Sequence, residues 1–524
     1  MAGNKSLGDA KTAKNDEFYT RYADIEAEMN AYYEYDNNIF RGKTVLLPCD
    51  DPEWSEFTRY FAANFDRFGL NKLISTSYAK SAGSRQLTLF EEESPLFDED
   101  KHDTHGKLFV IERREADTKP IDMDNIEFRG YLDGDGDFRS REVTKLRDEA
   151  DIIITNPPFS LFREFFAWIM RGEKRFVILG SMNAITYKEI FPYLKDNLVW
   201  LGYKSLNSDM YFNVTEEYQH WLVENKKEGS AYKEINGIVM GRLASACWFT
   251  NIDHGKRHEL LSLDTMAHNL KFNKKLRKKF LDEYGKLEYP HYDNYDAIEV
   301  PFVEAIPSDY IPTEGLTNST FDIESSTDRQ TDRQTDRQTD RQTDRQTDRQ
   351  TDRQTDRQTD SLKSAMASWE CLSPSSTNIT PSSSASSDLL LETSEDLQES
   401  NPIQEKTDHT SMGSCGMAGF SSRKSNGVMG VPITFLDKYN PEQFEITGIT
   451  LGNTVEYEMT HIYENAVQHN KNGSTQCGSK VNTRATVLLS QAPSDTVYYT
   501  ADNCNGFLLS IYPRILIRAK AGKR

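Results

Sequence analysis

The sequence predicts an α/β protein in which helices cover both faces of a mostly parallel β-sheet. Short apolar runs of strand length recur along the first 311 residues. Amphipathic stretches of helical length lie between them, as at 55–68 and 160–171. Strands that alternate with helices are typical of a parallel sheet, whose ligands bind at the carboxyl ends of its strands. The expected strands are residues 44–47, 72–74, 108–111, 151–155 and 176–179.

The composition bounds the kind of protein. Only 37 % of the 524 residues are hydrophobic, which indicates a compact part joined to a long polar segment. No apolar stretch reaches the roughly 18 residues that a membrane helix needs, and residues 1–15 have no apolar core of a signal peptide. The six cysteines are scattered without a CxxC pair, so we expect no zinc site or disulfide framework and a reducing, cytoplasmic setting.

A polar segment divides the expected folded regions. Residues 327–358 are eight identical copies of Thr-Asp-Arg-Gln, followed by Thr359 and Asp360. This repeat (327–360) has no apolar residue, and Ser/Thr-rich sequence follows it, so we expect 312–426 to be a disordered insertion. Such an insertion is tolerated because closure entropy grows slowly with loop length. Further strands are expected at 431–436, 444–449, 485–489, 507–511 and 515–517.

The net charge of −20 argues against non-specific binding to nucleic acid. It does not exclude an enzyme that acts on DNA, because only the surface that meets phosphate must be basic. One basic run stands out, and it is either a solvated helix face or a phosphate-contact surface. Its members are Lys271, Lys274, Lys275, Arg277, Lys278 and Lys279.

The strongest chemical signal is the NPPF motif Asn156-Pro157-Pro158-Phe159, directly after the expected strand 151–155. The amine of adenine is a poor nucleophile because the ring delocalises its lone pair. An Asn carboxamide oxygen and a neighbouring backbone carbonyl can accept both amine hydrogens and localise that lone pair toward a methyl donor. The prolines hold the loop and donate nothing, and Phe159 can stack on a flipped base. The alternative is a simple Asn-Pro turn.

Other segments carry a resemblance to known enzymes. The NPPF motif resembles the catalytic motif of amino-directed DNA methyltransferases, and three residues near the N-terminus resemble their FYT motif. More narrowly, residues 15–311 and 427–450 are similar throughout to the EcoRI-type adenine-specific methyltransferase family. The FYT residues are Phe18, Tyr19 and Thr20; the first cofactor loop matches Pro48, Asp50, Asp51 and Pro52; the third cofactor element matches Asp137 and Phe138.

The resemblance implies a doubly wound, Rossmann-like methyltransferase sheet that uses S-adenosylmethionine to methylate N6 of adenine in double-stranded DNA. The FYT residues would hold the amino-acid end of this cofactor, and Asp137 and Phe138 its adenine. The catalytic domain would cover 1–255, and a C-terminal target-recognition region, split by the insertion, would cover 256–311 and 427–524. We expect a monomer in the bacterial cytoplasm, with a restriction endonuclease as a potential partner.

Two departures from the usual pattern of amino-directed methyltransferases affect the cofactor site, and the EcoRI-type family shares the first. Asp50, Asp51 and Pro52 stand where the usual first cofactor loop has glycines. The acidic residue expected after the second strand, which would bind the ribose hydroxyls, is absent, and Ser75 to Tyr78 stand there instead. The ribose ligand is therefore left unassigned.

Several alternatives stay open. Cytosine N4-methylation uses a similar motif, and a catalytically degenerate DNA-binding protein would retain the fold without turnover. No metal is expected: the series Asp133, Asp135, Asp137 lacks the later Gly and Glu of a calcium loop, and His254 and His258 have no third ligand nearby. Cys247 and Trp248 are expected in the core or near the cofactor. The DNA recognition sequence is not predicted.

The repeat has a second interpretation, at the level of the gene. Thr, Asp, Arg and Gln can be encoded by a run of the tetranucleotide ACAG, which yields a four-residue peptide period when it is read in triplets. Such a tract slips during replication, and a change of one unit would shift the frame and replace everything after it. We therefore expect phase-variable methylation, whereas a repeat built from mixed codons would be stable.

Overall fold

The computed structural model describes most of the chain outside the predicted insertion. The insertion (312–426) and its repeat lie outside the described residues, as do Phe18, Asp51 and Pro52 of the predicted cofactor site. The described residues are 19–48, 50, 55–79, 94–114, 120–243, 245–310, 427–451 and 459–520.

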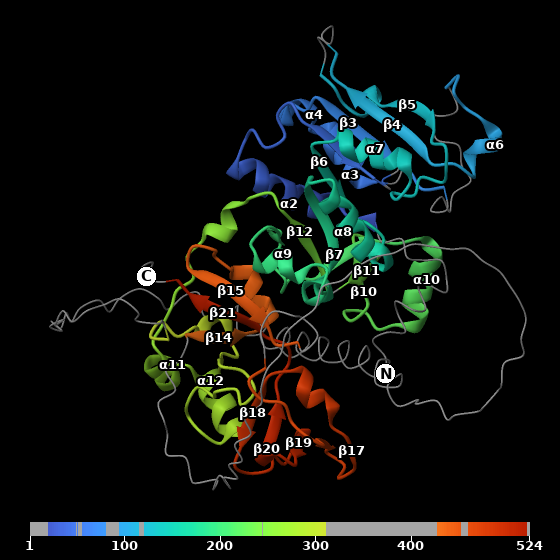
Figure 1. Cartoon of the computed structure of the whole chain (residues 1–524). Coiled ribbons are helices and arrows are strands. Elements are labelled where there is room, and N and C mark those ends of the chain that lie inside the picture. Colours follow the sequence, from blue (N-terminus) through green and yellow to red (C-terminus); the bar gives the residue numbers. More distant parts are fainter. Residues whose placement is uncertain are drawn as a thin grey trace, which may run out of the picture.

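An eight-stranded sheet forms the core of the N-terminal half (Figure 1). Its four central strands are parallel, in the order β3, β2, β6, β7. Antiparallel strands extend it on both sides, to the full order β5-β4-β3-β2-β6-β7-β12-β8. The strands are β2 (Thr44–Leu47), β3 (Lys72–Thr76), β4 (Lys107–Glu112), β5 (Glu127–Tyr131), β6 (Ile152–Thr155), β7 (Arg175–Ser181), β8 (Trp200–Leu201) and β12 (Ala246–Thr250).

The prediction of a mostly parallel sheet was wrong, because three of its seven strand pairings are parallel and four are antiparallel. The predicted strand at 108–111 is β4, and it runs antiparallel to β3. A buried apolar run looks the same in either direction, since strand direction is set by the connection and not by the run itself. The α/β class and the five strand positions predicted in this half are confirmed.

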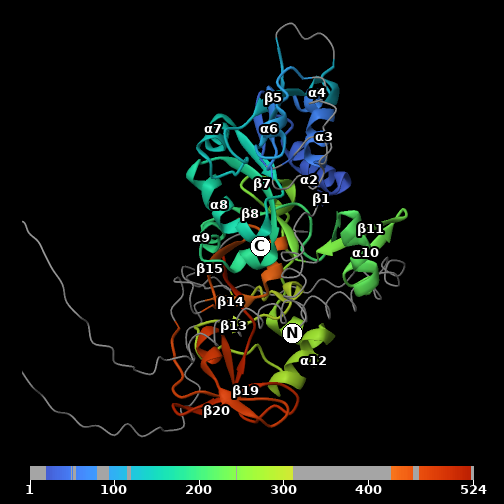
Figure 2. The ribbon, with the colours of Figure 1, turned by 90° about the vertical axis from the view of Figure 1, so that its right-hand side faces the viewer.

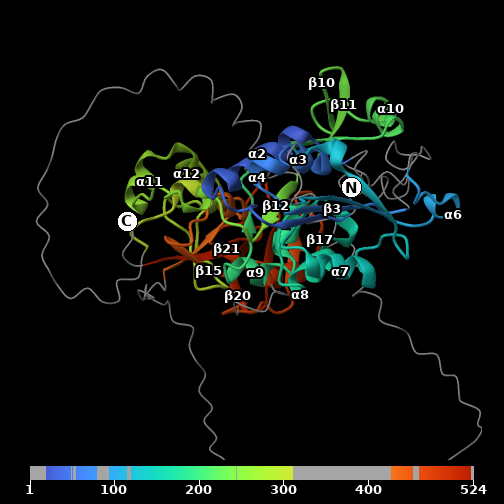
Figure 3. The same cartoon turned by 90° about the horizontal axis from the view of Figure 1, so that it is seen from above.

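Helices cover both faces of this sheet, as Figure 3 shows from above. Successive residues of β2 point to opposite faces, so that Val45 and Leu47 join one core cluster and Leu46 the other. The first cluster includes residues of α2 (Tyr22–Tyr35), α3 (Glu56–Ala63) and α4 (Phe65–Phe68). The second includes residues of α7 (Arg141–Glu149), α8 (Phe162–Arg171) and α9 (Phe191–Lys195).

A smaller sheet stands beside the large one (Figure 2). Its order is β1 (Tyr19–Thr20), β9 (Met210–Asn213), β11 (Ile238–Leu243), β10 (Tyr232–Ile235), and α10 (Glu216–Asn225) packs against β11. Strand β1 carries two residues of the FYT motif. Strands β11 and β12 are neighbours in the chain but lie in different sheets.

The C-terminal half contains two further sheets and a pair of short helices, α11 (Met266–Phe272) and α12 (Lys274–Lys279), followed by a π-helix (Phe280–Tyr284). One sheet has four strands: β13 (Ile298–Glu299), β14 (Val428–Val431), β21 (Ile515–Ala519) and β15 (Phe444–Ile449). The other has five: β17 (Thr475–Cys477), β16 (Val467–His469), β19 (Tyr498–Ala501), β20 (Cys504–Ser510) and β18 (Thr486–Leu489).

Most of the strands predicted after residue 426 are present, but the one at 431–436 is not. Strand β14 ends at Val431, and a 3₁₀ helix, η7 (Ile433–Lys438), follows Pro432. Proline has no N–H to donate to a sheet and starts a helical turn well, so it ends this strand. A short apolar run alone cannot distinguish the two structures.

The chain before the insertion and the chain after it build one structure. Strand β13 pairs in parallel with β14, with Ile298 opposite Met429. Arg514 donates to both carboxylate oxygens of Glu299, from Nη2 at 2.9 Å and Nε at 3.3 Å, and Glu299 is fully buried. One apolar cluster runs from Leu46 of the large sheet to Ile517 of β21. Among the described residues, no helix is long and apolar enough to span a membrane.

Candidate active site

The NPPF motif and the first cofactor loop lie side by side at the carboxyl ends of two neighbouring strands. Leu46 of β2 is opposite Ile153 of β6 in parallel register. Beyond the ends of these strands, the buried Thr155 Oγ1 donates a 2.8 Å hydrogen bond to the carbonyl oxygen of Pro48. Because parallel strands deliver their following loops to the same edge of the sheet, the two predicted sites are brought together.

The NPPF loop is held closely. Pro157 is buried, whereas Pro158 is exposed and precedes the 3₁₀ turn η2 (Phe159–Leu161). Leu161 N donates to the carbonyl of Pro158 at 2.9 Å, and α8 continues directly from this turn. Asn156 and Phe159 are half-buried, and Phe159 packs at the border of the core cluster that includes α2 and α3. Both side chains thus lie between the interior and the surface at the strand end.

The first cofactor loop is organised by side chains where related loops use glycines. Asp50 is buried, and its Oδ1 accepts a 2.8 Å hydrogen bond from Ser55 Oγ, the N-cap of α3. The backbone carbonyl of Asp50 accepts from the hydroxyls of Thr58 and Ser75. Asp50 therefore fixes the path of the loop and the start of α3. Neither Ser55 nor Thr58 was predicted for this loop, although a serine at the N-cap of an apolar helix is a sequence signal for the first.

Ser75 stands at the end of β3, where an acidic ribose ligand was sought and not found. Its buried hydroxyl binds the first cofactor loop. The next serine, Ser77, accepts from Lys107 N at 3.1 Å, and its backbone lies against Gly136. Gly136 has φ +86°, and a Cβ there would lie 2.2 Å from the carbonyl oxygen of Ser77, so only glycine fits. This contact brings the third cofactor element to the same edge of the sheet.

Asp137 and Phe138, the two predicted residues of the third cofactor element, both interact closely with other residues of the protein. Arg139 makes a two-pronged ion pair with Asp137, with Nη2–Oδ2 at 2.6 Å and Nε–Oδ1 at 2.9 Å. The ring of Phe138 is 2 % exposed and packs edge-on against Phe165 and Trp168. Phe138 therefore belongs to the core that supports this loop.

The N-terminal motif enters the site through β1. Tyr19 pairs with Asn213 and Thr20 with Phe212, and β1 also contacts α3. Thr20 is buried, and its Oγ1 has no hydrogen-bond partner among the described residues. A buried hydroxyl without a partner is costly in a finished structure. The Thr20 hydroxyl is therefore suited to form a hydrogen bond with a polar ligand.

The basic run lies elsewhere. Its members occupy the end of α11 and the whole of α12, and all are exposed except Lys279, which is half-buried and pairs with Glu283. Figures 1 and 3 show both helices on the side of the molecule opposite α6 (Glu99–His102). Helix α6 precedes β4, which is antiparallel to β3, so α6 marks the side where the central strands end. The structure does not bring the basic run to the NPPF loop.

Three other residues singled out in the sequence, Cys247, Trp248 and His254, are buried. Cys247 and Trp248 are buried in β12, and burial raises the pKa of the Cys247 thiol well above its usual range. Burial lowers the pKa of His254 to about 4, and its Nε2 lies 3.0 Å from the carbonyl of Leu201. His258 pairs with Asp253 at 2.9 Å. Within the described part of the chain, no three potential metal ligands cluster.

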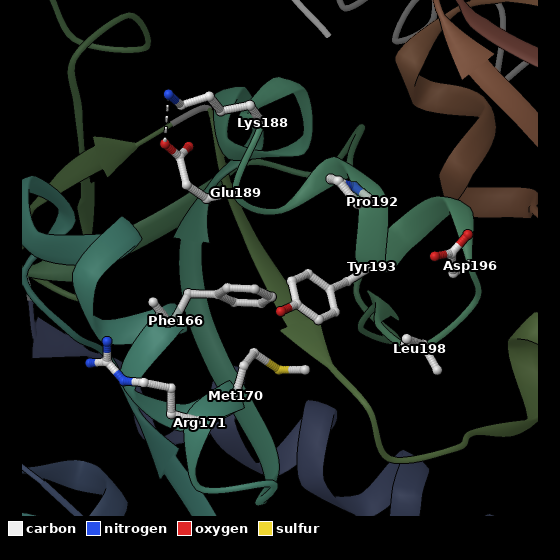
Figure 4. Close-up of a pocket in the computed structure, with 10 residues that line it drawn as sticks. Phe166, Met170, Arg171, Lys188, Glu189, Pro192, Tyr193, Asp196 and Leu198 are labelled. Carbon is white, nitrogen blue, oxygen red and sulfur yellow. Dashed lines mark ion pairs between the residues drawn. The ribbon is translucent and has the colours of Figure 1, made fainter. Parts of the chain in front are cut away.

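A separate hollow lies away from the strand ends, between α8 and α9 (Figure 4). Phe166 and Tyr193 meet edge-on at its floor, with ring centroids 5.4 Å apart, and Met170 and Leu198 line it. Lys188 and Glu189 lie at its rim. It contains none of the predicted catalytic or cofactor-binding residues.

The same arrangement of motifs can be sought in known proteins. The sequence profile of the family described as "Adenine-specific methyltransferase EcoRI" matches residues 6–364 and 423–492. The chain belongs to this family. It is an adenine-specific DNA methyltransferase, as the NPPF motif and the resemblance predicted.

Three curated relatives of this methyltransferase are informative. The Type II methyltransferase M.EcoRI of Escherichia coli is 38 % identical over 315 residues, which cover 60 % of this chain and 84 % of the relative. The Type II methyltransferase M.MgeORF184P of Mycoplasma genitalium is 32 % identical over 301 residues, which cover 57 % of this chain and 77 % of the relative. The Type II methyltransferase M.MpnI of Mycoplasma pneumoniae is 30 % identical over 311 residues, which cover 59 % of this chain and 78 % of the relative. No solved structure matches the chain.

Proposed function

We propose that this methyltransferase transfers a methyl group from S-adenosylmethionine to N6 of an adenine that is rotated out of duplex DNA. The observation that carries the proposal is the juxtaposition of the NPPF loop with the first cofactor loop, joined by the Thr155–Pro48 hydrogen bond. A donor held by one loop and an acceptor held by the other would meet at the same strand ends.

The NPPF residues would activate the acceptor amine. The carboxamide oxygen of Asn156 and the backbone carbonyl of Pro157 accept its two hydrogens, which localises the nitrogen lone pair toward the donor. Phe159 stacks on the flipped base, and Pro158 fixes the turn. When bound, S-adenosylmethionine supplies an electrophilic methyl group on a sulfonium. Methyl transfer would leave the donor sulfur as a neutral thioether, and the acceptor nitrogen would release one proton to solvent.

The residues present fit this cofactor. The buried Thr20 Oγ1 lacks a hydrogen-bond partner among the described residues and would complete its bonding on the amino-acid end, beside Phe18 and Tyr19. Pro48, Asp50, Asp51 and Pro52 would form the loop around the donor. Asp137 would meet the cofactor's adenine, sharing its carboxylate with Arg139, while the buried Phe138 supports the loop. The parallel strands β3, β2, β6 and β7 support a Rossmann-like assignment.

The domain assignment follows from the same proposal. Residues 1–255 would bind the cofactor and catalyse, and 256–311 with 427–524 would recognise DNA, with the basic run on phosphate. We propose a monomer that acts on DNA in the bacterial cytoplasm, and a cognate restriction endonuclease is a candidate partner. The apolar cluster common to both regions supports a fixed orientation between them.

We also propose that the repeat switches this activity genetically. A frame shift in an ACAG tract would remove β14, β15 and β21, and with them Arg514, which pairs with the buried Glu299. A buried charge that loses its partner costs roughly 3–5 kcal/mol, so the shortened product should not fold. Sequencing the tract in sibling colonies tests this: mixed codons or a constant length would exclude the switch.

The reaction itself is tested by product analysis. The full chain is incubated with duplex DNA and S-adenosylmethionine. The DNA is then digested, and its nucleosides are identified by mass spectrometry. N6-methyladenine supports the proposal. N4-methylcytosine would favour the alternative acceptor. No product, together with no heat of cofactor binding in calorimetry, would indicate a degenerate DNA-binding protein.

A further inference from the structure

The C-terminal half contains a stretch that is unusual for so acidic a chain. Residues 465–494 contain no Asp or Glu, whereas the whole chain has 82 acidic residues among 524. At that frequency, about five would be expected in 30 residues. The same stretch contains Lys471, which is exposed, and Lys480, which is half-buried, so it is locally cationic; its third basic residue, Arg484, is buried. Because the chain as a whole repels polyanions, such a region is where a phosphate backbone could approach.

The structure forms the centre of this stretch into an exposed hairpin. Strands β16 and β17 pair in antiparallel register, with His469 opposite Thr475, and β17 is an edge strand whose three residues are all exposed. The turn is closed by a hydrogen bond from Gly473 N to the carbonyl of Asn470 at 2.9 Å, and Gly473 has φ +79°. This is a three-residue hairpin loop with a glycine bulge.

The side chains of the turn are ordered without help from a partner. Asn472 Oδ1 accepts from Ser474 N at 3.1 Å and Ser474 Oγ at 2.7 Å, and Asn470 Nδ2 donates to Ser474 Oγ. The ring of His469 stacks on Tyr498, with centroids 4.6 Å apart. Lys471, at the tip, is exposed. A rigid polar ribbon loses little conformational entropy when it binds, which suits contact with DNA.

The hairpin lies on the side of the molecule opposite the basic run. In Figure 1, β17 is at the right-hand end of its sheet, on the same side of the view as α6, the helix that marks the carboxyl ends of the central strands. Helices α11 and α12 lie on the other side. The apolar cluster beneath the hairpin, which includes Tyr463 and Tyr499, contains no residue of the large sheet. Figure 1 shows β17 at the end of the molecule away from β6, so the contact of the hairpin with DNA would be separate from the target base.

We propose that the β16–β17 hairpin binds the phosphate backbone of duplex DNA beyond the target adenine. This inference rests on the proposed function, which supplies the DNA. Acidic residues lie at both ends of the acid-free stretch, with Glu464 three residues before β16 and Asp495 after the stretch. Asp495 is exposed and lies three residues before Tyr498, which pairs with His469. Removing this charge should therefore act in the opposite sense to removing that of Lys471.

The native chain offers a direct probe, because Cys477 on β17 is an exposed free thiol. The full chain, with and without duplex DNA, is treated with an alkylating agent, and each cysteine is quantified by peptide mass. A duplex of about 30 base pairs should protect Cys477, whereas one of about 12 base pairs, roughly 40 Å long, should not. Equal alkylation in all three samples would overturn the proposal, and protection by the short duplex would overturn the remote position.

Charge variants give the second readout. On the long duplex, Lys471→Gln should weaken binding and lower the slope of log affinity against log salt by about 1, and Asp495→Asn should strengthen binding. Lys145→Gln, an exposed lysine on α7, is the matched control. Unchanged affinities for both hairpin variants would overturn the proposal. Methylation by the wild type is measured in parallel: its absence, with Cys477 still protected, would refute the proposed function and leave the hairpin contact standing.

Discussion

The hydroxyl of Thr155 donates to the carbonyl of Pro48 across 2.8 Å, in a position that is fully buried. This hydrogen bond links the last residue of β6 to the first residue after β2, and so it links the loop that would hold the base to the loop that would hold the methyl donor. The two loops are thus positioned by the sheet and by one side chain between them.

Replacing Thr155 with valine keeps the shape and removes the donor. The buried carbonyl of Pro48 then loses a hydrogen bond, which should cost roughly 1–3 kcal/mol of stability. It should also weaken cofactor binding, measured by calorimetry. Thr250→Val is the control. Thr250, in β12, is equally buried, and its hydroxyl donates to the carbonyl oxygen of Phe176 in β7 at 2.7 Å. If both variants lose stability and neither loses cofactor affinity, the bond serves only the fold.

Phe159→Ala should impair base flipping more than cofactor binding. Stacking of a base on an aromatic ring contributes roughly 1–3 kcal/mol, and the half-buried ring lies at the end of β6. A fluorescent base analogue at the target position reports the flipped state, and calorimetry with the cofactor serves as the control. A fluorescence change equal to that of the wild type would remove Phe159 from this role.

The sequence predicted the features that depend on neighbouring residues and not those that depend on contacts between distant segments. The NPPF motif could be placed because its chemistry and its position after a strand are both local. The network of Asp50, Ser55 and Ser75 could not, since it joins residues up to 25 positions apart through the folding of three elements. The direction of β4 and the end of β14 at Pro432 depended on connections and on one proline, which apolar runs do not report.

The basic run on α11 and α12 is a prediction that the salt dependence of binding can test. Replacing Lys274, Lys275 and Lys278 with glutamine should weaken binding to all DNA sequences alike. The salt slope should fall by about 0.9 for each phosphate that these lysines neutralise in the wild type. The exposure of all three side chains permits this role. An unchanged slope would show that the run is a solvated helix face, in agreement with its position opposite α6.

Deleting 312–426 and joining Ile311 to Gly427 through a short Gly/Ser linker should preserve folding and activity. Strands β13 and β14 already pair across this junction. Shortening the connection should stabilise the fold by about 2 kcal/mol at most, because closure entropy depends weakly on length. A deletion that also removes β14 is the control and should be insoluble. A soluble but inactive first variant would indicate a functional task for the segment.

The central claim is that Asn156 activates the target amine, and the turnover of Asn156→Ala tests it most directly. Methyl transfer to duplex DNA is followed with labelled S-adenosylmethionine, and calorimetry checks that the variant still binds the cofactor. If Asn156 activates the amine, cofactor affinity should be unchanged and the rate should be lower by a factor on the order of 10²–10³. A variant that binds the cofactor and keeps more than about a tenth of the wild-type rate, a barrier change below about 1.4 kcal/mol, would contradict it.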